Sequence, residues 1–230
     1  MKRFLLLLLL GIVFLAGKAA KQIKYPYYSH NKGDYSLSID SVSLTDKATE
    51  FDVSFYNHNG MWVRLDPDSK LVGKATGKEY AILSVEGIKP GEKKYMPFSG
   101  YISSKIIFPP IAPADSIVDF IEPGGWEITG IKLYDDTKDK IKTNVSGTVE
   151  SDLISWLYAM PVSSGPVNKK SYIIPVRNGK FNYDFYTEKP IECVIIPGND
   201  FLEGIFGRTI KFKTEGRPLV FNFELDDTDL

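Results

Sequence analysis

One stretch near the end of the chain decides its fold class: Ile173-Ile174-Pro175-Val176-Arg177-Asn178-Gly179-Lys180-Phe181-Asn182-Tyr183-Asp184-Phe185. Asn-Gly is the favoured pair for the two-residue type I′ turn of a β-hairpin. After this turn, apolar and polar residues alternate, as they do in a half-buried strand. The stretch therefore predicts a β-hairpin in which Phe181, Tyr183 and Phe185 share one face.

Further strand signals lie on both sides of this hairpin. Ile191 to Ile196 is apolar on both faces, which is typical of a strand at the centre of a sheet. Residues 152–160 fit either a strand or one face of a short helix. Two alternating arms around Glu215-Gly216-Arg217-Pro218 predict a second hairpin. The arms and one further predicted strand are residues 210–213, 219–225 and 145–149. Together these elements predict a small β-sandwich over residues 143–226.

An earlier region, residues 35–136, shows the same period-two alternation. Its phase shifts after Asp40-Ser41, which predicts a β-bulge or kink. About seven short strands separated by turns are typical of a β-sandwich of immunoglobulin-like shape. The Cys-Trp-Cys framework of true immunoglobulin domains is missing. The predicted strands are residues 35–39 continued by 42–44 after the phase shift, 51–55, 61–65, 80–85, 102–108, 117–121 and 125–134.

The two patterned regions meet at a polar, charged stretch from Asp135 to Lys140. Such stretches are typical of domain boundaries, and we expect one here. The alternative is strand-end chemistry within a single sheet. The preferred prediction is an all-β chain with two antiparallel β-sandwich domains.

The first 19 residues have the order of a secretory signal peptide. Lys2 and Arg3 precede an apolar run from Phe4 to Ala16, and the small residues Gly17 and Ala19 follow. A bilayer-spanning helix needs roughly 20 apolar residues, and this run is shorter, although an uncleaved anchor is the alternative. Cleavage after Ala19 would leave residues 20–34 as a flexible segment and give a periplasmic or extracellular protein with no stable membrane span.

Composition narrows the function classes. The 28 basic and 29 acidic residues nearly balance, so nucleic acid is not an expected partner. Hydrophobic residues make up 43% of the chain, which is enough to build packed cores. The single cysteine, Cys193, excludes an intramolecular disulfide, and it is far from the cleavage site that a lipoprotein would need.

Three segments of the second region carry a family resemblance: Val145-Ser146-Gly147-Thr148-Val149, the hairpin from Pro175 to Phe181, and Phe212 to Phe223. They resemble small β-sandwich modules of exported bacterial proteins, which often precede a thioredoxin-like domain in thiol-disulfide oxidoreductases. In the first region, residues 97–100 and 126–133 resemble β-modules from similar proteins. The thioredoxin-like domain and its Cys-x-x-Cys pair are absent here, so the resemblance implies an accessory or recognition module.

The residue types that carry catalysis or bind metals are sparse. Cys193 lies in an apolar strand, which predicts a buried, unreactive thiol. His30 and His58, the only histidines, have no ligand partners at metal-binding spacing. The Asp66-Pro67-Asp68-Ser69 stretch has carboxylates two residues apart, but it lacks the remaining features of a calcium loop and predicts a turn. We therefore expect no catalytic residues, cofactor or metal.

Aromatic residues in loops are the remaining candidates for ligand contacts, because such rings can stack on sugars or anchor peptides. Burial at the ends of the sandwiches is the alternative. The candidates are Tyr27, Tyr28, Trp62, Phe201 and Phe206, with Tyr25 beside the first two. The sequence thus predicts a non-catalytic cell-envelope protein that acts by binding or assembly, with an envelope protein or a glycan as partner. The alternatives are a carbohydrate-binding module and an enzyme of unrecognised type.

Overall fold

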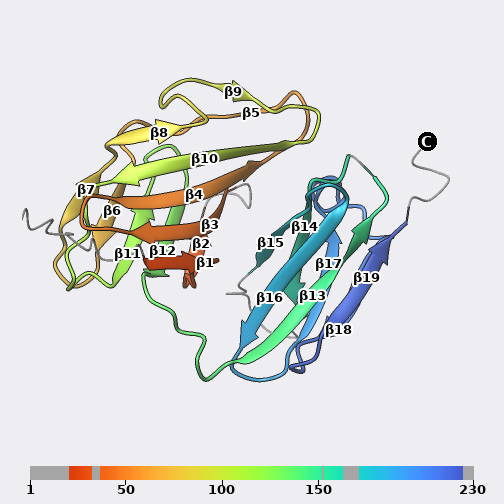
Figure 1. The fold of residues 1–230 in the computed structure, drawn as a ribbon. Helices are drawn as coiled ribbons and strands as arrows, with labels where there is room; N and C mark the ends of the chain where they lie inside the picture. The colour runs from red at the N-terminus through yellow and green to blue at the C-terminus, as the bar shows by residue number, and fades with distance from the viewer. Residues whose placement is uncertain (1–20, 33–36, 152, 163–170, 225–230) are drawn as a thin grey trace, which may run out of the picture.

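The computed structural model describes residues 21–32, 37–151, 153–162 and 171–224. These residues form strands almost throughout, with one short helix, α1 (Gly198–Glu203). Figure 1 shows two groups of strands joined by a single crossing of the chain. The all-β sandwich fold predicted from the sequence is confirmed. The predicted signal peptide lies outside the described residues.

The first sandwich consists of two five-stranded sheets and a short ribbon. One sheet has the order β1 (Lys21–Lys24), β3 (Leu37–Leu44), β4 (Thr49–Tyr56), β10 (Tyr101–Phe108), β8 (Ser84–Glu86). The other has the order β2 (His30–Lys32), β12 (Glu127–Lys132), β11 (Ile117–Ile121), β6 (Lys70–Gly73), β7 (Glu79–Ala81). The ribbon pairs β5 (Trp62–Val63) with β9 (Lys94–Tyr95).

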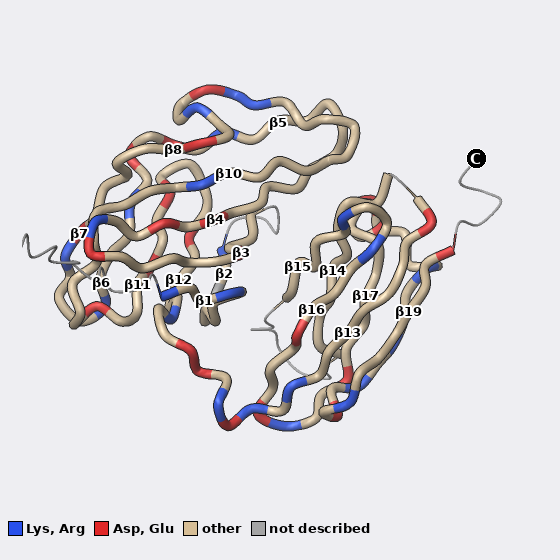
Figure 2. The backbone as a smooth tube through the Cα atoms, in the orientation of Figure 1, with Lys and Arg blue, Asp and Glu red and all other residues tan. Residues whose placement is uncertain are grey.

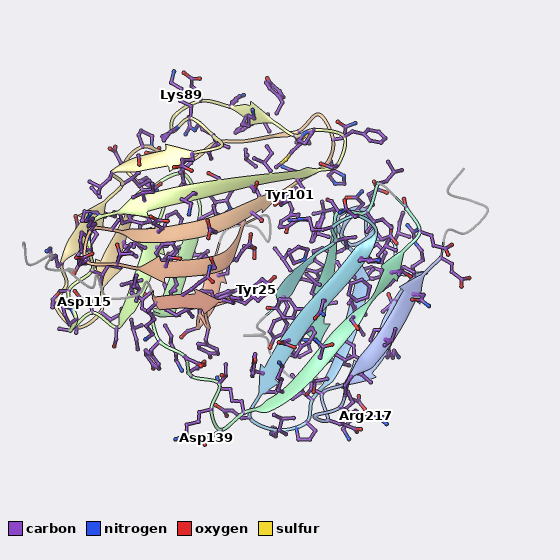
Figure 3. All side chains as sticks on the ribbon, in the orientation of Figure 1. Tyr25, Lys89, Tyr101, Asp115, Asp139 and Arg217 are labelled. Carbon is purple, nitrogen blue, oxygen red and sulfur yellow. The ribbon has the colours of Figure 1, made fainter. Side chains whose placement is uncertain are left out.

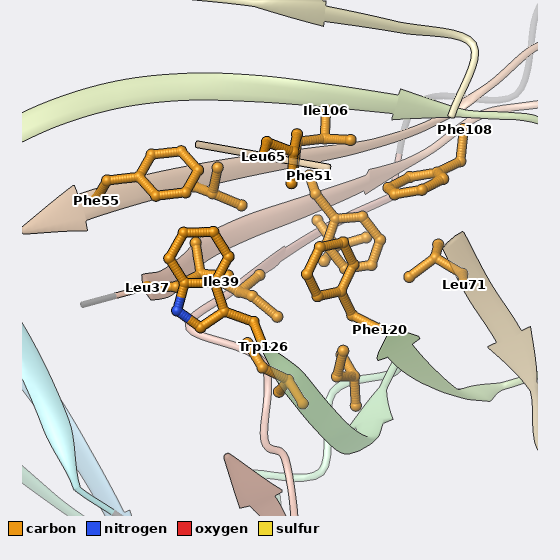
Figure 4. Packing of buried hydrophobic residues seen from close by; sticks show 14 of the residues in the cluster. Leu37, Ile39, Phe51, Phe55, Leu65, Leu71, Ile106, Phe108, Phe120 and Trp126 are labelled. Atoms are coloured by element: carbon orange, nitrogen blue, oxygen red, sulfur yellow. The ribbon is translucent and has the colours of Figure 1, made fainter. Parts of the chain in front are cut away.

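Alternation along the strands builds the core of this sandwich. Phe51 and Phe55 on β4 point between the sheets and are almost fully buried. Phe51 meets Phe108 edge-on, with ring centroids 5.5 Å apart, and Phe120 completes the packing from the opposite sheet (Figure 4). The predicted bulge is also present, because the β3–β4 register shifts between Ile39 and Ser41.

The N-terminal segment differs from the flexible one expected from the sequence. β1 pairs with β3, and β2 pairs with β12, so residues 21–32 add one edge strand to each sheet. Ile23 lies in the core of the first sandwich, which accounts for this order. The predicted strand over residues 80–85 is wrong in one respect, since it divides into β7 and β8, which belong to opposite sheets.

The second sandwich is smaller and packs a three-stranded sheet on a four-stranded one. The first has the order β16 (Lys180–Thr187), β13 (Ile141–Val149), β19 (Leu219–Phe223). The second has the order β15 (Tyr172–Pro175), β14 (Trp156–Pro161), β17 (Glu192–Pro197), β18 (Ile210–Lys213). Of the ambiguous residues 152–160, residues 156–160 thus belong to a strand, and β17 is central in its sheet as predicted.

The predicted Asn-Gly turn is present. Asn178 and Gly179 have φ angles of 51° and 66°, and Arg177 and Lys180 exchange backbone hydrogen bonds of 2.8 and 3.0 Å across them. Pairing stops there, because β15 and β16 enter opposite sheets. Phe181, Tyr183 and Phe185 do share the buried face of β16.

The second predicted hairpin, residues 210–213 with 219–225, is wrong. β18 pairs with β17 in the four-stranded sheet, whereas β19 runs parallel to β13 in the other sheet. The Glu215–Pro218 turn therefore carries the chain from one layer of the sandwich to the other. Leu225 lies outside the described residues.

An aromatic cluster joins the two sandwiches. We call it the seam: Tyr56 from β4, Trp156 and Tyr158 from β14, Ile173 from β15 and Ile196 from β17, all buried. The Tyr56 and Trp156 ring centroids are 4.9 Å apart. The four-stranded sheet is therefore covered on both faces, by its own sandwich on one side and by the seam on the other.

Polar contacts cross between the sandwiches beside the seam. The Ser155 hydroxyl donates to the carbonyl of Ser99, and the Arg177 guanidinium lies 3.8 Å from the centre of the Tyr101 ring. The His58 imidazole faces the Glu203 carboxylate at 3.8 Å. Tyr101 lies on the side of the first sandwich that faces the second (Figure 3). These contacts fix the relative position of the two sandwiches.

Candidate functional site

A cleft of about 710 Å³ opens between the two sandwiches. Its walls come mainly from β1 with the residues that follow it, the segment from Tyr134 to Lys140, and β16. Asp40 and Ser41 of β3 and Tyr172 of β15 complete the lining. Tyr25, which lines the cleft, projects from the first sandwich towards the second (Figure 3). The cleft thus exists only where both sandwiches are present.

Two strand edges form opposite walls of this cleft. Gln22-Ile23-Lys24 line it on one side and Asn182-Tyr183-Asp184 on the other. Consecutive residues of a strand point to opposite faces of the sheet, so an unbroken run of lining residues means that the cleft follows the edge of each strand. β1 and β16 are both terminal strands of their sheets.

Tyrosine rings line the space between these edges. Tyr25 packs against Tyr183, with ring centroids 4.6 Å apart, and bridges the two sandwiches. The Tyr27 ring lies under two ammonium groups, Lys132 at 4.6 Å and Lys140 at 5.0 Å from its centroid. The half-buried tyrosines of the lining are Tyr25, Tyr27, Tyr134 and Tyr186, and Tyr172 and Tyr183 are more deeply buried.

The carboxylates of the cleft already have partners within the chain. Asp136 accepts from Lys132 at 2.8 Å and from Lys140 at 2.7 Å. Burial would raise the pKa of Asp136, but these two hydrogen bonds outweigh it and lower the pKa. Asp184 is held in the same way by Lys142 and Asn144, each at 2.8 Å. Acidic and basic residues follow one another along the segment between the two sandwiches (Figure 2).

Asp40 differs from the other carboxylates. It occupies the bulge of β3, and the Ser54 hydroxyl donates to its Oδ2. Burial is the main cause that raises the pKa of Asp40. Its Oδ1 is buried and has no hydrogen-bond partner among the described residues, as is also true of the Tyr56 hydroxyl and the Trp156 indole nitrogen in the seam. Each such atom reduces the stability gained from the packing around it, because an unsatisfied buried polar atom costs about 1–3 kcal/mol.

The aromatic residues predicted from the sequence do not come together. Tyr27 lines the cleft. Tyr28 lies beside it, donating its hydroxyl to the Ser171 carbonyl at 3.3 Å, and burial raises the pKa of Tyr28 to about 12. Phe201 stacks on Tyr158 of the seam at 3.9 Å. Trp62 and Phe206 are exposed and do not line the cleft.

Sequence reasoning missed Tyr134, Asn182, Asp184 and Tyr186 as lining residues. Asn182 and Asp184 are the outward-facing positions of the predicted strand over residues 181–185, and Tyr186 lies one residue beyond its predicted end. Nothing in the sequence placed that strand beside the boundary segment.

The structure places the cysteine, the acidic turn and His30, which the sequence had raised as candidates, in parts of the fold outside the cleft. Cys193 is fully buried, and burial raises the pKa of its thiol to about 12. Residues 66–69 form the predicted turn, in which the Ser69 amide donates to the Asp66 carbonyl at 3.1 Å. His30 begins β2. Over residues 21–32, 37–151, 153–162 and 171–224, no group of three or more His, Cys, Asp or Glu side chains is placed to hold a metal. No described helix has both the length and the apolarity to pass through a bilayer.

No protein-family model matches the chain, and no curated protein is similar to it in sequence. The resemblance of residues 143–226 to β-modules of exported proteins therefore stays a prediction.

Proposed function

We propose that this chain is an exported, non-catalytic recognition protein of the cell envelope, which holds its ligand in the cleft between the two sandwiches. The observation that carries the proposal is the composition of the cleft walls. Both sandwiches and the segment between them contribute, so the two sandwiches act together as one binding unit.

The polar groups of the cleft support binding over catalysis. A carboxylate that acts as a general acid or base must be free to reach the substrate. Asp136 and Asp184 are each held by two side chains of the protein itself, and Asp135 accepts from the backbone and side chain of Thr137. Asp40, the fourth carboxylate of the lining, accepts from the Ser54 hydroxyl. Tyrosine rings, in contrast, offer large and rigid contact area with a polar tip, which suits recognition.

Site-specific photo-crosslinking in the cells that produce the protein tests this proposal. A benzoylphenylalanine at position 186 places the reactive group in the cleft, and the same residue at position 220 places it on an exposed strand elsewhere. We expect a covalent adduct from position 186 that is absent from position 220. No adduct from the cleft position, or equal adducts from both, would overturn the proposal.

A further inference from the structure

We propose that the ligand of this cleft is an extended polypeptide segment, which adds as a strand to the free edge of β16. This inference rests on the proposed function and specifies its ligand. It follows from the direction of the backbone groups along the cleft.

The hydrogen-bonding direction of β16 is fixed at its first residue. In a strand, the N–H and C=O of one residue point to the same side, and those of the next residue point to the other. Lys180 exchanges both of its backbone bonds with Arg177, which lies on the side away from β13. Gly179, one residue earlier, accepts from Val149 at the end of β13.

The register of β13 with β16 continues without a shift to Thr187. The alternation therefore directs the backbone N–H and C=O of Asn182, Asp184 and Tyr186 away from β13. All three residues line the cleft. Within the described part of the chain, β16 pairs with no strand on that side.

The wall of the cleft that faces β16 is formed by β1, and it also presents backbone groups to the cleft. The Tyr25 amide donates to the Asp40 carbonyl of β3 at 2.8 Å, so the backbone groups of Gln22 and Lys24 point away from β3 and into the cleft. The described strands leave this edge of β1 unpaired as well. The cleft thus lies between two rows of backbone donors and acceptors that no strand of the described residues pairs.

An extended peptide is the ligand that matches this arrangement. Its own N–H and C=O groups repeat at the spacing of the open edge, which is the basis of recognition by strand addition. β16 has eight residues and is therefore roughly 27 Å long, enough for several such bonds. Tyr27 and Tyr186 supply ring surfaces for the peptide's side chains. A sugar has no backbone amides that repeat at the spacing of these edges.

The test uses the purified full chain and linear peptides selected on it from a random phage-displayed library, long enough to span β16. The best peptide is synthesised in two N-methylated forms, each blocking alternate backbone amides. Because only one set of amides can face β16, we expect one form to bind at least about tenfold more weakly and the other to bind within about threefold of the parent.

Protein variants provide the second arm. Asn182→Pro removes an outward amide that the fold does not use, and Asn182→Ala removes the side chain but keeps the amide. Val220→Pro is the matched control, since Val220 is exposed on β19, the other edge of the same sheet, outside the cleft. We expect Asn182→Pro alone to weaken peptide binding by about tenfold or more.

Equal binding of the two N-methylated forms, or undiminished binding to Asn182→Pro, would overturn the inference. A library that yields no binder would overturn it too. Binding of a neutral oligosaccharide such as maltohexaose or chitohexaose in the cleft, or a crosslinked glycan at position 186, would refute the peptide while leaving the proposed function intact.

Discussion

Replacing Trp156 by alanine should separate the unfolding of the two sandwiches. Trp156 is 1% exposed and contacts Tyr56 of the first sandwich, whereas its neighbour Leu157 points into the core of the second. A large aromatic side chain buries ~150–250 Å², which at ~25 cal/mol per Å² corresponds to about 4–6 kcal/mol. The unpartnered indole nitrogen offsets about 1–3 kcal/mol of this. A loss of about 3 kcal/mol is therefore expected.

Differential scanning calorimetry measures this effect directly. The wild-type protein should unfold in one transition, because the seam makes each sandwich depend on the other. If both sandwiches unfold together, as a unit of about 200 residues, a loss of about 3 kcal/mol corresponds to a Tm decrease of roughly 6–12 °C. In Trp156→Ala we expect two transitions, with the second sandwich unfolding first.

Leu157→Ala is the control, because it removes packing from the same strand without touching the seam. It should cost about 2–5 kcal/mol and still give a single transition. Two independent transitions in the wild-type protein would refute the coupling of the sandwiches. So would a Trp156→Ala variant indistinguishable from Leu157→Ala.

Three further predictions concern single positions. Gly179→Val should lower the free energy of unfolding by more than ~1 kcal/mol, because a β-branched residue resists a φ of 66°. The control variant Asn178→Gly should be nearly neutral. Equal denaturation midpoints for Gly179→Val and the wild-type protein would contradict this prediction. Cys193 should react slowly with a thiol reagent in the native state and rapidly in denaturant. Its thiol ionises near pH 9.0 in the unfolded chain and near pH 12 in the folded one, so stability should fall as pH rises between these values, and less so in Cys193→Ala. Mass spectrometry of exported material should find Ala20 as the first residue, and retention of Met1 would disprove cleavage.

Local sequence patterns predicted most of the strands because their causes are local. Alternation fixes which side chains of a strand are buried, and Asn178-Gly179 supplies the positive φ angles of a tight turn. The bulge after Ile39 was visible for the same reason, since an extra residue shifts the phase of the alternation.

The sheet to which each strand belongs could not be predicted in this way. Period two gives the buried face of a strand but not its partner. β18 and β19 look like the arms of a hairpin, yet β19 pairs with β13, about seventy residues earlier, in a parallel register that no local pattern records. The same limit hid the candidate site, because β1 and β16, which line it, lie far apart in the sequence.

The seam and the cleft depend on each other. Residues 156–159 of β14 are all buried, since one face packs in the second sandwich and the other packs in the seam. Because both faces of β14 are buried, its sequence lacks the apolar–polar alternation that would have identified it as a strand. The packing in the seam also holds the edge of β16 opposite β1. Trp156→Ala should therefore weaken binding of the selected peptide more than Leu157→Ala does, when both are measured by calorimetry at a temperature where each variant is folded. If both variants bind the peptide as tightly as the wild-type protein, the cleft does not need the seam, and β16 alone recognises the ligand.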